Sequence, residues 1–103
     1  MYYRYEIKCK GYYDDWTGVF QFFDPSQRRK WYCLHVPKYY EDNPDTENTR
    51  SWFTQHGYDK YHEKMDAMLS IYEDDPDVQI RILTAETLDN IVMQGKTQCI
   101  QLI

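Results

Sequence analysis

Residues 54–72, TQHGYDKYHEKMDAMLSIY, decide the fold because they carry the clearest helical periodicity in the chain. Thr54 is a suitable N-cap, and the acidic run with a proline at residues 73–76 ends the pattern. The apolar side chains recur three and four residues apart and share one face: Tyr58, Tyr61, Met65, Met68, Leu69 and Tyr72. Gly57 weakens the first turn. We predict one amphipathic helix over residues 55–72, which needs an apolar surface to pack on.

The residues before this helix show the alternation that is typical of strands. In residues 2–10 one face would carry Tyr3, Tyr5, Ile7 and Cys9, and the other Arg4, Glu6, Lys8 and Lys10. Residues 11–18 contain turn-forming residues, and residues 19–23 and 30–36 are two further strand candidates. The last of these has apolar side chains on both faces, as a central strand would. The simplest assembly is an antiparallel meander of three strands.

The residues around and after the helix complete the predicted fold. Residues 38–49 read as a polar acidic loop, and residues 78–82 alternate as a fourth strand. Residues 85–93 could form a short helix, or residues 91–93 could pair with residues 99–103 as a hairpin. The expected fold is α+β: a mostly antiparallel sheet of four to five strands, with one main amphipathic helix packed on one face. Residues 1–103 form a single domain.

Composition excludes several protein classes. No apolar run approaches the roughly 20 residues that a membrane span needs, and the start of the chain lacks the apolar stretch of a signal peptide. Three cysteines at unpatterned spacings argue against a disulfide framework and for a reducing compartment. We therefore expect a cytoplasmic protein that has no contact with a membrane. The oligomeric state is left open.

The charge is unevenly distributed. Residues 1–36 carry six basic and four acidic side chains, whereas residues 37–103 carry six basic and thirteen acidic ones, and the formal net charge is −5. Such a surface repels nucleic acid, since its binding relies on neutralising phosphates. It could attract a protein partner with a basic surface, or serve solubility alone.

Candidate catalytic and metal-binding groups are sparse. Cys33 and His35 have the nucleophile-and-base residue types, and with Cys9 they could bind zinc, but no supporting spacing is present. On the helix, Asp59, His62 and Asp66 lie close to one line and could serve a small metal-assisted hydrolase. A solvated helix face explains the same three residues. Because no phosphate-binding, metalloprotease or nucleophile motif occurs, the sequence predicts a protein that is not an enzyme and holds no metal or cofactor.

A second alternative is single-stranded nucleic-acid binding. The basic cluster at residues 28–30 is followed by Trp31, and basic residues beside aromatic rings are what such binding uses. Tyr3 and Tyr5 on a sheet face could stack bases together with Trp31. The acidity of the rest of the chain argues against this reading.

Tyrosines and carboxylates are the remaining residues that indicate a possible binding site. Eleven tyrosines include three adjacent pairs, and neighbouring residues of a strand point to opposite faces, so some of these rings should be exposed. Exposed tyrosines suit contact sites. The chain has two acidic stretches, one beside the tyrosine pair at residues 39–40 and one directly after the helix. Together they contain the predicted partner-binding residues: Tyr39, Tyr40, Glu41, Asp42, Asp45, Glu73, Asp74, Asp75 and Asp77.

In size, charge and composition the chain resembles the small acidic inhibitor proteins that phages and other mobile elements encode, anti-CRISPR proteins among them. The resemblance covers the whole chain as a profile and involves no shared motif. It implies a non-catalytic protein-binding domain that docks on a nucleic-acid-binding or effector protein, with carboxylates occupying a groove made for phosphates.

Overall fold

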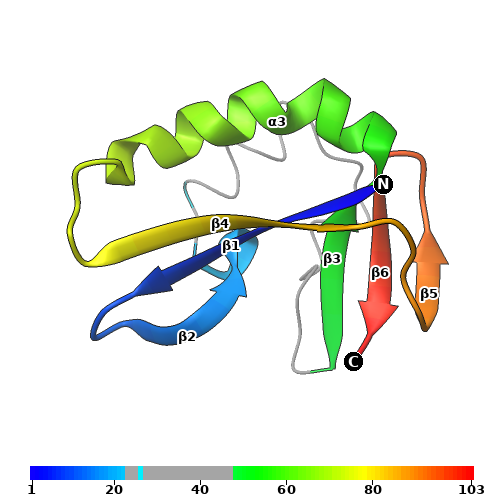
Figure 1. Ribbon diagram of the computed structural model, residues 1–103, viewed down its shortest axis with the longest axis horizontal. Helices are drawn as coiled ribbons and strands as arrows, with labels where there is room; N and C mark the ends of the chain where they lie inside the picture. The colour runs from blue at the N-terminus through cyan, green and yellow to red at the C-terminus, as the bar shows by residue number, and fades with distance from the viewer. Residues whose placement is uncertain (23–25, 27–47) are drawn as a thin grey trace.

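The computed structural model describes residues 1–22, 26 and 48–103 (Figure 1). One long helix packs against a six-stranded antiparallel sheet, so the predicted α+β class is confirmed, with slightly more strands than expected. The strands are β1 (Tyr2–Cys9), β2 (Tyr13–Gly18), β3 (Thr49–Phe53), β4 (Val78–Ala85), β5 (Ile91–Gln94) and β6 (Gln98–Leu102). The helices are α1 (Val19–Phe22), α3 (Gln55–Leu69) and the short 3-10 turn η2 (Ser70–Tyr72).

Strand β1 is the centre of the sheet. It pairs with β4 over its whole length, from Tyr2 opposite Ala85 to Cys9 opposite Val78. A strand has two edges, so β2 and β3 share the other one: β2 pairs with the second half of β1, and β3 meets it at Tyr3. Strands β6 and β5 continue the sheet from β3, and Figure 1 shows these three strands crossing the direction of β1 and β4.

Helix α3 begins and ends close to the predicted positions. The Thr54 hydroxyl accepts the N–H of Gly57 at 3.0 Å and donates to the Lys96 carbonyl at 2.7 Å, which ties the helix start to the turn between β5 and β6. The predicted stripe faces the sheet, with Tyr61, Met65 and Leu69 buried. In the described part of the chain, no helix combines the length and apolar character needed to cross a membrane.

The core lies between α3 and the sheet and is rich in tyrosine. Tyr5 and Ile7 of β1 meet Phe53 and the buried stripe of α3, and Tyr3 stacks on Tyr58 with ring centroids 3.8 Å apart. Aromatic pairs in this geometry add to the stability that burial alone provides. The expectation that tyrosines on β1 and on the helix serve the core is confirmed. Tyr12, in the turn between β1 and β2, is by contrast strongly exposed.

The expected second strand at residues 19–23 is wrong. Val19–Phe22 forms the short helix α1, because Gly18 closes the pairing of β2 with β1 and the chain then turns inward. Val19 and Phe22 stand three residues apart, so a helical turn directs both toward the core. The expected turn at residues 11–18 is also too long, since β2 begins at Tyr13. The predicted three-stranded meander is therefore wrong at its second strand. Its predicted third strand, residues 30–36, lies outside the described residues.

Two further differences concern the strands around the helix. No sequence pattern predicted β3 at Thr49–Phe53, where three consecutive side chains, Ser51, Trp52 and Phe53, are buried. After β4, the chain forms the β5–β6 hairpin and not the alternative helix at residues 85–93. Strand β4 extends to Ala85, beyond the expected end at residue 82.

Candidate functional site

An acidic turn, residues 73–77, joins η2 to the start of β4. Its backbone is fixed by short-range hydrogen bonds, from the N–H of Asp75 to the Tyr72 carbonyl at 3.1 Å and from the N–H of Asp77 to the Asp75 carboxylate at 2.9 Å. All four carboxylate residues are exposed. None of them forms an ion pair with another residue of the described ranges. The turn thus presents a compact negative charge on an ordered frame.

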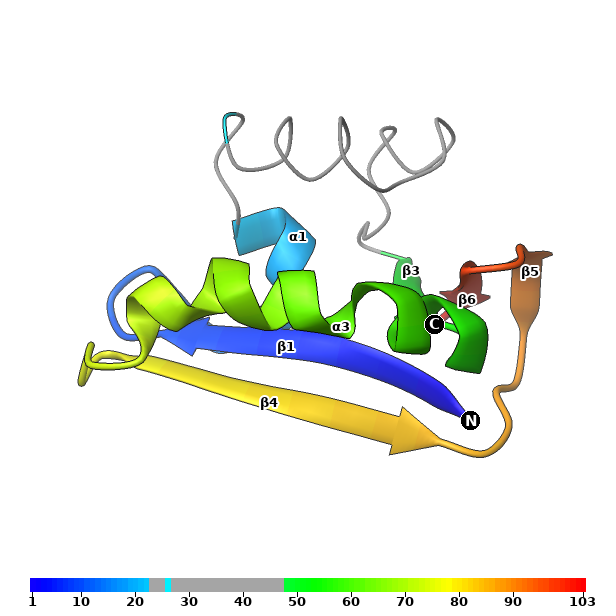
Figure 2. The ribbon, with the colours of Figure 1, turned by 90° about the horizontal axis from the view of Figure 1, so that it is seen from above.

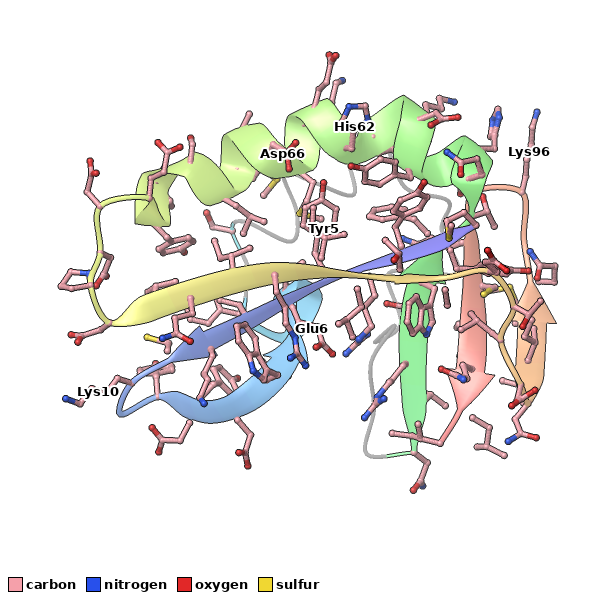
Figure 3. All side chains as sticks on the ribbon, in the orientation of Figure 1. Tyr5, Glu6, Lys10, His62, Asp66 and Lys96 are labelled. Carbon is pink, nitrogen blue, oxygen red and sulfur yellow. The ribbon has the colours of Figure 1, made fainter. Side chains whose placement is uncertain are left out.

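An open groove begins beside this turn and runs between α3 and β4. Its volume is about 490 Å³, and its lining combines apolar with acidic side chains: Tyr5, Asp66, Leu69, Ser70, Glu73, Ile80, Arg81 and Ile82. The Tyr5 hydroxyl donates to the Asp66 carboxylate at 2.8 Å, which holds that carboxylate at the groove wall. Figure 3 shows Tyr5 rising from β1 toward Asp66 on the helix. Burial and this hydrogen bond raise the pKa of Tyr5 far above its ordinary value.

The groove is open because the helix does not cover β4. Helix α3 packs on β1 and β3, and β4 lies clear of it in Figure 2. Ile80 and Ile82 point to the helix side of the sheet, opposite Ile7 and Tyr5, yet they remain 37% and 41% exposed. Ile71 is exposed nearby, at the end of the helix. Large apolar side chains therefore stand in solvent next to the acidic turn.

A buried ion-pair cluster occupies the opposite face of the same strands. Glu6 of β1 accepts from Arg4 at 2.9 Å and from Arg81 of β4 at 2.6 Å, and Arg4 and Glu6 are both buried. Arg81 also lies over the Trp16 ring at 4.2 Å. Burial opposes ionisation of Glu6, but the hydrogen bonds from Arg4 and Arg81 outweigh it and hold the pKa of Glu6 below its ordinary value. In Figure 3, Glu6 points away from the helix.

This cluster determines the charge of the groove. Arg81 borders the groove, but its guanidinium is engaged with Glu6 and Trp16 on the other face of the sheet. The carboxylates that line the groove are those of Asp66 and Glu73, and Glu73 is the first residue of the acidic turn. The site is therefore apolar along β4 and negative along the helix and turn.

The structure separates the predicted partner-binding residues into two sets. Tyr39, Tyr40, Glu41, Asp42 and Asp45 lie outside the described residues. Glu73, Asp74, Asp75 and Asp77 form the acidic turn beside the groove. Sequence reasoning missed the groove itself. The alternation predicts only that Ile80 and Ile82 share one face of a fourth strand, and their exposure depends on β4 being an edge strand.

The candidate metal-assisted site on the helix is not assembled. Asp59 accepts from the Gln55 amide at 2.9 Å, and Asp66 accepts from Tyr5. His62 stacks on Tyr58, and its Nδ1 lies 2.8 Å from the Tyr58 carbonyl. Across residues 1–22, 26 and 48–103 no group of three potential ligands is placed to hold a metal ion. Cys33 and His35 lie outside these ranges, whereas Cys9 is half-buried on β1.

The two sheet tyrosines of the nucleic-acid alternative, Tyr3 and Tyr5, both contact helix α3. Tyr5 is buried beneath α3, and the Tyr3 ring is stacked on Tyr58 of the same helix. The Tyr5 ring is thus unavailable for stacking, and one face of the Tyr3 ring is occupied by Tyr58. The basic cluster at residues 28–30 and Trp31 lie outside the described residues.

Comparison with known proteins identified no relative of this chain. The sequence matches no protein-family model, and no curated protein and no solved structure is significantly similar to it.

Proposed function

We propose that this chain is a non-catalytic protein-binding domain that docks on a partner with a basic surface. The observation that carries the proposal is the continuity of the acidic turn with the groove between α3 and β4. Exposed carboxylates on a fixed backbone attract a basic surface, and the exposed isoleucines beside them offer apolar area to bury once contact is made. Charge alone would serve solubility, whereas charge beside an exposed apolar strip is typical of an interface.

In its specific form, the proposal is an inhibitor of a nucleic-acid-binding or effector protein. The surfaces with which such proteins hold phosphates are basic, so a rigid row of carboxylates can occupy them in competition with the nucleic acid. The chain's resemblance to small acidic inhibitors of mobile elements, anti-CRISPR proteins among them, supports this class of partner. The exposed acidic turn is the part of the described structure that would enter the partner's basic groove.

The test is a charge reversal of the acidic turn in two steps. The tagged chain captures partners from its native host, and the captured protein is purified and titrated with wild type and with the Glu73→Lys/Asp74→Lys double variant. These two residues are chosen because the Asp75 side chain supports the turn itself. We expect the reversal to weaken binding by about tenfold or more and to reduce its salt dependence, since the loss falls on long-range attraction.

The matched control is Glu86→Lys/Asp89→Lys, which makes the same change in net charge at exposed positions beyond the other end of β4. It should change affinity by less than about threefold if the location of the charge matters. Equal losses in both variants would reduce the effect to net charge. Binding that survives the reversal at low salt would show that the acidic turn is not the contact. The inhibitor form also requires that the captured protein lose its nucleic acid when wild type is added.

A further inference from the structure

The outer edge of β4 presents unpaired backbone groups in a fixed pattern. The N–H of Lys10 donates to the Asp77 carbonyl at 2.9 Å, and the register places Cys9 opposite Val78. Hydrogen-bonded and non-bonded pairs alternate in an antiparallel ladder, so Gln79, Arg81 and Leu83 direct their backbone groups at β1. The N–H and C=O groups of the residues between them, Ile80 and Ile82, then point away from β1. No strand in the described part of the chain receives them.

This edge lacks the features with which proteins usually protect an edge strand. Strand β4 is eight residues long, pairs with β1 without a register shift, and contains no proline or glycine. Its one charged residue, Arg81, is held by Glu6. The other edge strands differ: β5 has four residues and a register shift between Ile91 and Met93, and β2 carries two exposed aspartates and pairs with β1 through a register shift. Strand β4 is therefore the edge that can accept another strand.

The groove specifies what the added strand should carry. A strand laid along β4 places every second side chain on the helix side, where Ile80, Ile82 and Leu69 provide apolar contacts. Asp66 and Glu73 line the same groove, and Glu73 begins the acidic turn. Asp66 uses one oxygen for Tyr5 and is exposed, so it can still accept from a cation. Branched apolar residues combined with lysine or arginine fit this surface.

A second copy of the chain fits the edge less well. Two β4 strands related by a two-fold axis would pair antiparallel. Each acidic turn would then approach the far end of the other β4, which is followed by the exposed Glu86 and Asp89. Like charges would meet there, and such contacts disfavour association. The charge pattern thus favours a basic partner over self-pairing.

We propose that the partner binds by strand addition: an extended segment pairs with the outer edge of β4, and the residues on its helix-facing side, every second one, are branched apolar or basic. Its apolar side chains lie against Ile80 and Ile82, and its basic side chains reach Asp66 and Glu73. Backbone hydrogen bonds supply part of the affinity and the groove supplies the selectivity. This mode of binding rests on the proposed function, because it names the segment through which the protein partner is held.

The test uses a synthetic peptide whose every second residue is alternately valine and lysine, with threonine between them, titrated into the isotope-labelled full chain and followed by NMR. Two analogues accompany it, one with glutamate in place of lysine and one with a central proline. We expect shifts and slowed hydrogen exchange at the outward-facing amides of Ile80 and Ile82. Both analogues should bind at least about tenfold more weakly, because one repels the carboxylates and the other cannot complete the ladder.

The matched variants are Ile80→Lys and Ile91→Lys, which make the same substitution at isoleucines that are both 37% exposed, on the edge strands β4 and β5. Only Ile80→Lys should abolish peptide binding. The mode is overturned if the peptide does not bind, if it shifts residues away from β4, or if the proline analogue binds equally well. A wild-type dimer that Ile80→Lys dissociates would assign the edge to a second copy. A captured partner that needs Glu73 and Asp74 but tolerates Ile80→Lys would leave the proposed function standing without strand addition.

Discussion

Gly57 of α3 lies directly against the carbonyl group of Thr97 in the turn before β6. A Cβ built on Gly57 would overlap the Thr97 oxygen and come within 2.7 Å of its carbonyl carbon. The N–H of Thr54 also donates to this carbonyl at 2.9 Å. The glycine thus allows the start of the helix to rest on the β5–β6 hairpin, and through this contact the position of α3 over β1 is fixed.

Gly57→Ala should destabilise the protein. Helix propensity alone predicts a gain of up to about 1 kcal/mol, but the added methyl group must displace backbone, and overpacking of that kind costs about 1–3 kcal/mol. We expect a net loss of about 1 kcal/mol, measured by urea denaturation. The control is Ala67→Gly, the reverse change at an exposed position of the same helix. It should cost about 1 kcal/mol, which measures the contribution of helix propensity alone. A more stable Gly57→Ala variant would contradict the close contact.

Glu6→Gln should be strongly destabilising at neutral pH. The carboxylate is buried and accepts from both Arg4 and Arg81, so its neutral replacement removes the negative charge from both ion pairs. Breaking a buried ion pair costs about 3 kcal/mol or more. Asp15→Asn, at an exposed position of β2, serves as the control and should change the free energy of unfolding by less than about 0.5 kcal/mol.

The same cluster makes stability depend on pH in the acid range. The pKa of Glu6 in the folded protein lies below its ordinary value of 4.5. The folded state therefore binds this proton more weakly than the unfolded chain does, and the ionised carboxylate stabilises the fold above pH 4.5. That contribution is lost as the pH falls through the folded-state pKa. Unfolding curves recorded from neutral to acid pH should fall more steeply for wild type than for Glu6→Gln, and parallel curves would argue against the pairing.

Two cysteines should differ sharply in reactivity. Cys99 is fully buried, and burial raises the pKa of its thiol from 9.0 to about 11, whereas Cys9 is half-buried. Alkylation by iodoacetamide at mildly alkaline pH, followed for each peptide by mass spectrometry, should label Cys9 quickly and Cys99 only after denaturant is added. The raised pKa also stabilises the fold below pH 9.0, and this contribution declines as the pH rises through about 11. Equal labelling rates would contradict the burial of Cys99.

The sequence predicted the elements whose signal is local and missed those that depend on distant partners. The helix and β1 were predictable because their apolar periods are written in consecutive residues. Strand β3 was not, because Trp52 and Phe53 are both buried only through pairing with β6 and packing under α3. The polar residues Arg4 and Glu6 suggested a solvent-facing side, and only the register with Arg81 of β4 shows that they form a buried cluster.

The candidate site divides in the same way. The local sequence alone identified Asp74 and Asp75, because an acidic run with a proline after a helix predicts an exposed turn. The groove could not be predicted, because Ile80 and Ile82 carry the same alternation in an edge strand as in a covered one. Their exposure follows from the sheet order and from the place where Gly57 and Thr54 fix the helix.

Hydrogen exchange along β4 in the free protein should alternate from one residue to the next. The amides of Gln79 and Arg81 point toward β1 and should exchange slowly, whereas those of Ile80 and Ile82 point to the open edge and should exchange faster by about tenfold or more. The measurement is amide exchange by NMR, recorded at two protein concentrations. Uniform protection at both concentrations would show that the edge is covered within the chain, and protection that appears only at high concentration would reveal self-pairing. Alternation at both concentrations leaves the edge open for a partner, because backbone groups that exchange freely are still available for pairing.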